Sequence, residues 1–212
     1  MFTGIVEGTG IVRERTETDD GLRLRIGIDT VEENGGETGD ARFDDLHHGQ
    51  SISVSGVCLT VESYGESDDG DAWFEVFLAS ETVEKTYLGA LREGDAVNVE
   101  RAMPADGRFD GHVVQGHVDT VTDVTAIEQV GEDWRFTFSI PEGHGRYLVD
   151  KGSVTLDGIS LTVAEKGESV FDVAIIPTTY ELTTLSEKSV GDPVHLEVDV
   201  IAKYVENMTE GY

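Results

Sequence analysis

The sequence predicts an all-β protein built from two tandem copies of one small, closed, antiparallel barrel. Three observations carry this prediction. One segment of eleven residues is written twice, short stretches of alternating apolar and polar residues fill both halves, and the gaps between them leave no room for crossover helices. A chain of 212 residues also has the length for two domains of about 100 residues that each bury a core.

The repeated segment reads SISVSGVCLTV at residues 51–61 and SVTLDGISLTV at residues 153–163. Five positions are identical, five are conservative exchanges, and only Ser55 against Asp157 changes in character. Because self-similarity of this quality marks repeat architectures, the segment indicates an internal duplication.

Three further pairs of segments extend the repeat over the chain. The copies are offset by 108 residues near the amino terminus, by 102 at the repeated segment and by 97 in the second part of each copy. The offset changes near Gly- and Asp-rich stretches at residues 32–45 and 65–72, which we expect to be surface loops, since loops tolerate insertions. The pairs are GIVEGTG (4–10) with HVVQGHV (112–118), FEVFLASETVEKTYL (74–88) with FDVAIIPTTYELTTL (171–185), and GDAVNVE (94–100) with GDPVHLE (191–197).

Each predicted strand rests on alternation with a period of two. In LRLRIGI (22–28), four aliphatic residues share one face, and Arg23 and Arg25 lie on the other. Gly- and Asp-containing turns separate the further strands. These are SISV (51–54), LTVES (59–63), WFEVFL (73–78) and AVNVE (96–100), which makes about six strands in each copy.

Helical segments are few. Ser80 is placed to cap a short helix through Leu88, mirrored at 178–185 in the second copy. In VIAKYVENM (200–208), apolar residues at helical spacing predict a terminal helix whose exposed stripe packs on another subunit. The resulting division is a first barrel at 1–111, a second barrel at 112–199 and an oligomerisation helix at 200–212.

The charge is extreme, with 43 Asp and Glu against 15 Lys and Arg, for a net charge of −28. Such a surface repels nucleic acid and anionic membranes, so neither is an expected partner. The regular alternation argues against disorder, and we expect a folded protein from a high-salt cytoplasm. Cys58 is the only cysteine, no apolar run has bilayer length, and Met1–Gly4 is not a signal peptide. These features predict a soluble, cytoplasmic protein.

Five motifs together resemble riboflavin synthase, the alpha-chain type with two lumazine-binding repeats. The resemblance spans the chain in order, and the acidic stretch at 32–45 departs from it. The motifs are MFTGIV (1–6), GVCLTV (56–61), NVERA (98–102), GHVVQGHVD (111–119) and DGISLTV (157–163).

The resemblance implies two six-stranded Greek-key barrels and a homotrimer held by terminal helices. It implies that two molecules of 6,7-dimethyl-8-ribityllumazine dismutate, one giving a four-carbon unit to the other, to yield riboflavin and 5-amino-6-ribitylaminouracil. One substrate is expected on the first barrel of one subunit and its mate on the second barrel of a neighbour. The pteridine ring is its own electron sink, so neither a metal nor an organic cofactor is expected, and alignment of two flat rings supplies much of the rate.

Residues alike in both copies are expected to hold what the two substrates share. Hydroxyls recur at Ser51 and Ser153 and at Thr60 and Thr162, and this recurrence favours a site over ordinary β-forming residues. By resemblance, the first pocket is lined by Gly4, Ile5, Val6, Cys58, Leu59, Thr60, Phe77, Leu78, Ala79, Ser80, Glu81 and Thr82. The second is lined by Gly116, His117, Val118, Lys151, Ser160, Leu161, Thr162, Ile175, Ile176, Pro177, Thr178, Thr179 and Tyr180.

Residues that differ between the copies are expected to carry the asymmetric chemistry, because one substrate donates and the other accepts. In the alignment above, Cys58 faces Ser160, His117 faces Thr9, His112 faces Gly4 and Asp199 faces Ala102. His117 is the candidate relay for a proton of the C7 methyl group. Cys58, Ser51 or a bound water is the candidate nucleophile, and Asp199 completes the catalytic set.

Each of these residues also has an ordinary structural interpretation. A lone cysteine is often a small buried hydrophobe, and a lone histidine on a strand is often a satisfied structural residue. Asp199 stands where it can cap the terminal helix. The pair His47 and His48 lies next to the acidic stretch without a second set of ligands, so we interpret it as solvated loop and not as a metal site.

The strongest alternative function is a non-catalytic protein of the same fold that carries a lumazine or flavin as a chromophore. Such a protein is expected to keep one pocket and lose the other, whereas here both GxxLTV segments and both GxV segments are intact. A flavin-dependent reductase is a weaker alternative, because no Gly-rich dinucleotide loop follows a strand and opens a helix.

Overall fold

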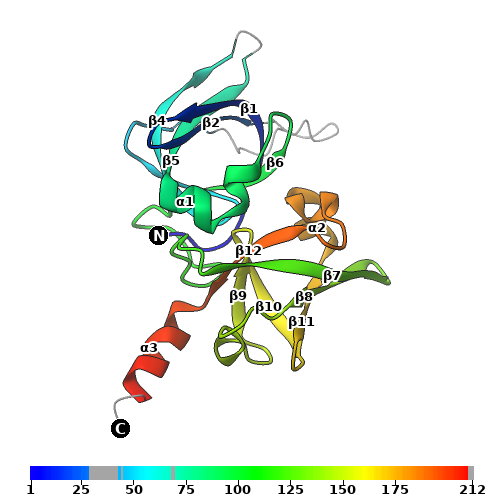
Figure 1. Cartoon of the computed structure of the whole chain (residues 1–212). Coiled ribbons are helices and arrows are strands. Elements are labelled where there is room, and N and C mark those ends of the chain that lie inside the picture. The colour runs from blue at the N-terminus through cyan, green and yellow to red at the C-terminus, as the bar shows by residue number, and fades with distance from the viewer. Residues whose placement is uncertain (29–42, 44, 68–69, 210–212) are drawn as a thin grey trace.

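Twelve strands form two closed, six-stranded antiparallel barrels in the computed structural model, which describes residues 1–28, 43, 45–67 and 70–209. The barrels are stacked, and helix α3 (Val200–Thr209) leaves the second barrel on the side away from the first (Figure 1). The predicted fold class, two six-stranded barrels with a terminal helix, is confirmed.

The first barrel has the strand order β1-β2-β5-β4-β3-β6 and closes through pairing of β6 with β1. Consecutive strands β3, β4 and β5 form a meander, and β6 returns to lie beside β3, which is the Greek-key arrangement. The strands are β1 (Gly8–Thr18), β2 (Gly21–Ile28), β3 (Ser51–Val54), β4 (Val57–Glu66), β5 (Ala72–Ala79) and β6 (Ala96–Arg101).

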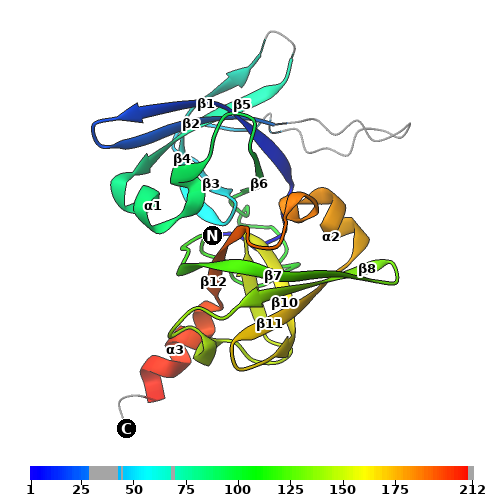
Figure 2. The same cartoon turned by 45° about the vertical axis from the view of Figure 1, so that its right-hand side comes forward.

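The second barrel repeats this topology, with the order β10-β11-β8-β7-β12-β9. Helices α1 and α2, one from each copy, lie beside the junction of the barrels (Figure 2). The strands are β7 (Thr120–Val130), β8 (Asp133–Ser139), β9 (Ser153–Leu156), β10 (Ile159–Lys166), β11 (Val170–Ile175) and β12 (Pro193–Val198). The helical segments are α1 (Ser80–Lys85), η1 (Tyr87–Ala90), η2 (Gly145–Tyr147), α2 (Pro177–Leu182) and η3 (Thr184–Glu187).

The alternation in β2 is confirmed: Leu22, Leu24, Ile26 and Ile28 are all buried in the core of the first barrel. The core of the second barrel includes three aromatic rings, those of Phe136, Phe138 and Phe171, with Phe138 and Phe171 stacked at 5.6 Å between centroids. The predicted acidic loop at 32–45 falls almost wholly outside the described residues. Among the residues that are described, no helix is long and apolar enough to cross a membrane.

The prediction that Ser80 caps a helix reaching Leu88 is wrong. Ser80 is the first residue of α1, and its hydroxyl donates to the carbonyl of Asp20 at 3.1 Å. The helix ends at Lys85 because Thr86 turns to an extended conformation while its hydroxyl donates to the carbonyl of Thr82 at 2.7 Å. In the second copy the helix likewise ends before its expected limit.

The barrels meet at two hairpin turns, one between β3 and β4 and one between β9 and β10. Gly56 and Gly158 occupy equivalent positions with φ of +84° and +83°. A Cβ atom on Gly56 would lie 2.7 Å from the backbone nitrogen of Gly158. The backbones therefore approach more closely than any side chain allows, and only glycine fits at the contact.

We expect Gly56→Ala to lower the free energy of unfolding by more than Gly94→Ala. Both positions have positive φ, so both variants carry the cost of about 1–2 kcal/mol for a left-handed residue with a side chain. Only at Gly56 does the added methyl group meet backbone, since nothing lies within 4 Å at Gly94. Denaturant unfolding of both variants at one fixed salt concentration measures the difference, and equal losses would contradict a tight junction.

Candidate active site

Two segments without regular secondary structure cross between the barrels. Strap 1 (residues 3–6) precedes β1, and strap 2 (residues 115–118) precedes β7. Strap 2 lies on the first barrel, since Cys58 N–H donates to the carbonyl of Gly116 at 2.8 Å and Val118 packs on that barrel's core. Strap 1 lies on the second barrel, where Ser160 N–H donates to the carbonyl of Gly4 at 2.7 Å. Each barrel therefore receives the strap that leads into the other.

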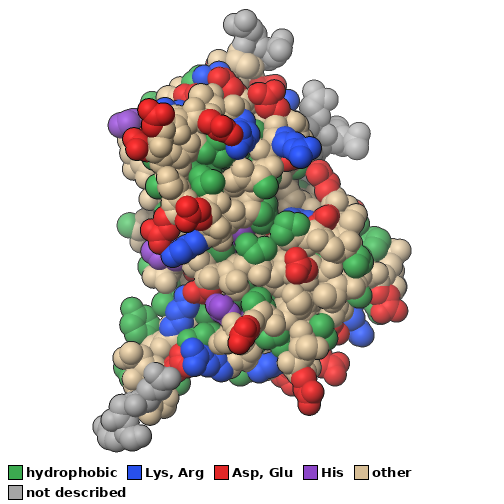
Figure 3. Space-filling model, in the orientation of Figure 1, with side chains coloured by type: hydrophobic (Ala, Val, Ile, Leu, Met, Phe, Trp, Pro, Cys, Tyr) green, Lys and Arg blue, Asp and Glu red, His purple; other side chains and the backbone are tan. Residues whose placement is uncertain are grey.

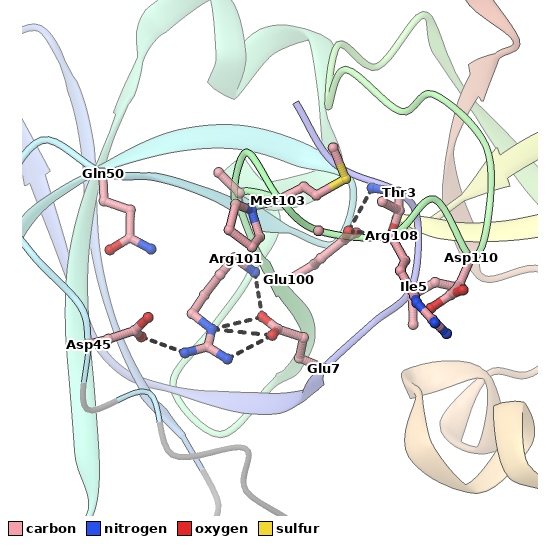
Figure 4. A pocket seen from close by; sticks show the side chains of 13 residues that line it. Thr3, Ile5, Glu7, Asp45, Gln50, Glu100, Arg101, Met103, Arg108 and Asp110 are labelled. Carbon is pink, nitrogen blue, oxygen red and sulfur yellow. Dashed lines mark hydrogen bonds and ion pairs between the residues drawn. The ribbon is translucent and has the colours of Figure 1, made fainter.

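A buried carboxylate anchors each strap. Glu100 accepts the N–H groups of Thr3 at 2.7 Å and Gly4 at 3.1 Å, one on each oxygen, and the Thr3 hydroxyl at 3.1 Å. Figure 4 shows the Glu100 side chain directed at Thr3 beneath a hollow in the surface. Burial raises the pKa of Glu100 to about 7, although these hydrogen bonds act in the opposite direction.

Glu197 anchors strap 2 in the same way. One carboxylate oxygen accepts the N–H of Gln115 at 2.7 Å, and the other accepts those of Gly116 at 2.9 Å and His117 at 3.0 Å. Burial raises the pKa of Glu197 as well, against the effect of its hydrogen bonds from Gln115 and Gly116 and the charge of Lys203.

These contacts correct the alignment of the two copies near the amino terminus. Gly4 and Gly116 both have φ of +76° and bond to equivalent glutamates, so the offset there is 112 residues and not 108. The true counterpart of His117 is Ile5, so the predicted pairings of His117 with Thr9 and of His112 with Gly4 are both wrong. The Gly-x-Val pattern shared by residues 4–6 and 116–118 is the signal for the correct register.

On the first barrel the structure brings Ser51, Cys58, Thr60 and strap 2 together. Thr60 is opposite Ser51 in the β3–β4 pairing, and Cys58 lies two residues before it on the same face of β4. Cys58 is half-buried, Thr60 is exposed, and His117 follows the glycine that contacts Cys58 with its own imidazole exposed. Phe77, Leu78 and Ala79 end β5, and Ser80, Glu81 and Thr82 begin α1.

On the second barrel, Ser160 meets strap 1 and also His112. The Ser160 hydroxyl lies 2.7 Å from Nδ1 of His112, and the hydroxyl of Thr155 lies 3.1 Å from Nε2. Burial lowers the pKa of His112, with the charge of Asp199 acting in the opposite direction. A neutral imidazole against a serine hydroxyl is the arrangement of a base beside a nucleophile. The sequence comparison singled out His112 but gave it no partner.

The remaining predicted residues of the second barrel lie on β10, on β11, on α2 and in the loop before β9. Thr162 is exposed on β10, and Lys151 has φ of +66°, with its ammonium group donating to the carbonyl of Ala164 at 3.1 Å. The Tyr180 ring stacks on Trp134 at 4.4 Å between centroids. Ile175 ends β11, Ile176 follows it, and Pro177, Thr178 and Thr179 begin α2. The side chains of Leu59, Leu78, Leu161 and Ile175 are buried in the barrel cores, so only the backbone groups of these residues remain to line a site.

The structure separates the four candidate catalytic residues. Ser51, Cys58 and His117 gather on the first barrel, whereas Asp199 stands near His112 on the second. One Asp199 oxygen accepts the N–H of Ile201 at 2.9 Å. Asp199 therefore caps α3, in agreement with its structural interpretation from the sequence. His47 and His48 are exposed, and no group of three metal-binding side chains occurs in the described part of the chain.

A hollow of about 330 Å³ lies beside strap 1, and of the predicted site residues only Ile5 lines it. Arg101 crosses it, paired with Glu7 at 2.8 Å and with Asp45 (Figure 4). Thr3 and Glu100 also line the hollow, so it adjoins strap 1 and its anchor, but it does not contain the other predicted pocket residues.

A family model described as a lumazine binding domain matches residues 3–102 and again residues 115–199, one match for each barrel. The riboflavin synthase of Mycobacterium tuberculosis (strain ATCC 25618 / H37Rv) is 44% identical over 212 residues, covering 98% of this chain and 98% of the relative. That of Bacillus subtilis (strain 168) is 38% identical over 205 residues, covering 97% of this chain and 88% of the relative.

The chain belongs to the riboflavin synthase family. Its function is that of a riboflavin synthase, and it is therefore an enzyme, a transferase.

Solved structures of LumP share the fold of this riboflavin synthase family member. LumP complexed with 6,7-dimethyl-8-(1'-D-ribityl) lumazine has a TM-score of 0.76 at 20% identity, over 93% of this chain and 99% of that chain. LumP complexed with riboflavin has a TM-score of 0.77 at 22% identity and the same coverage. Identity this low shows a common fold alone.

Proposed function

We propose that the chain converts two molecules of 6,7-dimethyl-8-ribityllumazine into riboflavin and 5-amino-6-ribitylaminouracil by transfer of a four-carbon unit. The observation that carries the proposal is the presence of two strap sites on equivalent frames, one per barrel, each with its own reactive side chains. A reaction between two identical molecules needs two similar pockets. A carrier that holds one chromophore needs only one pocket. Two sites that both have reactive side chains therefore favour the enzyme over the chromophore carrier.

The strap contacts support a grouping of pocket residues that crosses the two copies. The first pocket comprises Ser51, Cys58, Leu59, Thr60, Phe77, Leu78, Ala79, Ser80, Glu81, Thr82, Gly116, His117 and Val118. The second comprises Gly4, Ile5, Val6, Lys151, Ser160, Leu161, Thr162, Ile175, Ile176, Pro177, Thr178, Thr179 and Tyr180. In each pocket the threonine and backbone groups hold the shared uracil-like edge of the ligand.

The chemistry differs between the pockets. In the first, His117 relays the proton of the C7 methyl group, and Cys58, Ser51 or a water is the candidate nucleophile at C7. In the second, the hydroxyl of Ser160 beside neutral His112 supplies a second nucleophile and base, with Asp199 nearby. Each pocket thus offers its own acid–base group and its own candidate nucleophile.

Incubating the purified chain with the lumazine alone tests the function directly. We expect riboflavin absorbance to rise, and dialysis against a chelator to leave the rate unchanged, because the pteridine serves as its own electron sink. A loss of activity that a metal or a nicotinamide cofactor restores would contradict this mechanism.

The His117→Ala variant should slow turnover by about 100-fold or more while leaving the dissociation constant of the lumazine nearly unchanged, since a proton relay acts in the transition state. Steady-state rates and fluorescence titration measure the two quantities. His144→Ala, which changes a half-buried histidine outside both pockets, is the matched control. Equal losses in rate and binding would make His117 a residue that holds the ligand.

We also propose a homotrimer in which the first pocket of one subunit faces the second pocket of a neighbour. An uncovered apolar stripe on α3 supports assembly: Ile201, Tyr204, Val205 and Met208 are between 55 and 70% exposed. Ion pairs hold the helix to its own barrel, with Arg146 bonding Glu206 at 2.8 Å and Lys203 bonding Asp119 at 2.6 Å.

Val205→Glu should therefore reduce the mass measured by sedimentation and abolish turnover, while each subunit still binds lumazine. Asn207→Glu places the same charge on an exposed polar position of α3 and should leave the mass unchanged. A trimeric and active Val205→Glu variant would exclude this helix as the contact.

The acidic surface supports a high-salt cytoplasmic origin. Carboxylates are scattered over both barrels on the visible face rather than gathered in one patch (Figure 3), and the net charge is −28. At 1 M salt the screening length falls to about 3 Å, which suppresses their repulsion. We expect the melting temperature to rise between dilute buffer and molar KCl, and a constant or falling value would count against this origin.

A further inference from the structure

Glu100 and Glu197 are buried carboxylates, and the oxygens of each accept hydrogen bonds from the residues of one strap. Glu100 is 5% exposed and Glu197 is 3% exposed. Glu197 receives three successive backbone N–H groups, those of residues 115, 116 and 117. Convergence of successive N–H groups on an anion requires a left-handed residue in the segment, and Gly116, with φ of +76°, supplies it.

The anchored straps reach the opposite barrels at very short range. A Cβ atom on Gly116 would lie 2.7 Å from Cβ of Cys58, and one on Gly4 would lie 2.6 Å from Cβ of Ser160. A strap that shifted by a fraction of an ångström would collide with these side chains or uncover them. The position of each strap is therefore fixed on one side by a glutamate and on the other by a pocket residue.

We propose that Glu197 and Glu100 are positioning residues that act crosswise, Glu197 of the second barrel setting the pocket of the first and Glu100 of the first barrel setting the pocket of the second. The proposal rests on the pocket grouping given under the proposed function. A residue that merely stabilised its own barrel would have no such effect on the other barrel.

Glutamine cannot replace either glutamate in this role. Both oxygens of each carboxylate accept backbone N–H groups. In glutamine one of these oxygens is replaced by an NH₂ group, which donates and would therefore face a backbone N–H that also donates. The variants Glu197→Gln and Glu100→Gln are nearly isosteric with the native residue, and each serves as the control for the other.

Cys58, the only cysteine of the chain, reports on the first pocket because it lies under strap 2. The rate of its alkylation by iodoacetamide, a neutral reagent, is measured on full-length variants in molar KCl. Loss of the charge-assisted anchor in Glu197→Gln should speed the alkylation about tenfold. Glu100→Gln should leave the rate within about twofold of the unaltered chain, because its strap lies on the other barrel. Equal rates in the two variants, or no change in Glu197→Gln, would overturn the proposal.

Protection of Cys58 by bound riboflavin tests whether the first pocket binds the ligand. Riboflavin should protect Cys58 of the unaltered chain from alkylation, and half-protection of Glu197→Gln should need about tenfold more riboflavin, with Glu100→Gln unaffected. If riboflavin fails to protect the unaltered chain while Glu197→Gln still speeds the alkylation, the strap geometry stands and the pocket assignment of the proposed function falls.

Two measurements guard against a variant that does not fold. Glu197→Asp keeps the charge and shortens the reach by one methylene, so it should show the same change in Cys58 alkylation to a smaller degree. In the unaltered chain, the amides of residues 115–117 should exchange slowly with solvent although they lie outside regular secondary structure. Exchange as fast as that of an open loop would show that Glu197 does not hold the strap.

Discussion

The structure depends on the close approach of two hairpin turns at the junction of the barrels. A Cβ atom on Gly56 or on Gly158 would come within 2.7 or 2.8 Å of the backbone nitrogen of the other. This contact sets the separation of the barrels. A strap of four residues reaches from the end of one barrel to the pocket strand of the other because that separation is so small.

Several polar groups at the junction form hydrogen bonds between the two copies. Asn98 donates from Nδ2 to the carbonyl of Asp157 at 2.9 Å, and Tyr87 N–H donates to Nε2 of His195 at 3.0 Å. Since Nε2 accepts, Nδ1 of the imidazole carries the proton and donates to the carbonyl of Ser55 at 2.7 Å. Burial lowers the pKa of His195, which keeps this ring in the neutral form that the geometry requires. Such directional hydrogen bonds fix the orientation of one barrel relative to the other, which apolar contacts alone do not.

Duplication followed by divergence explains why the two sites share a frame and differ in chemistry. The glycine of each strap, the glutamate that anchors it and the threonine of each pocket strand recur. The side chains that contact or flank the straps do not: Cys58 corresponds to Ser160, and Ile5 corresponds to His117. Transfer between two identical molecules demands this combination, because the pockets must bind the same ligand and treat it differently.

The sequence by itself determined the two barrels, because apolar alternation selects which face of each strand is buried, as Leu22, Leu24 and Ile26 illustrate. It also determined the duplication and the family, through motifs that span the whole chain. Only the tertiary structure decided that Gly116 meets Cys58 and that Gly4 meets Ser160, since a strap has no periodicity from which its docking partner can be inferred. The same holds for the His112–Ser160 pair and for the anchoring glutamates. These contacts join residues 48 to 156 positions apart, and the packing of the closed barrels, not local sequence, brings them together.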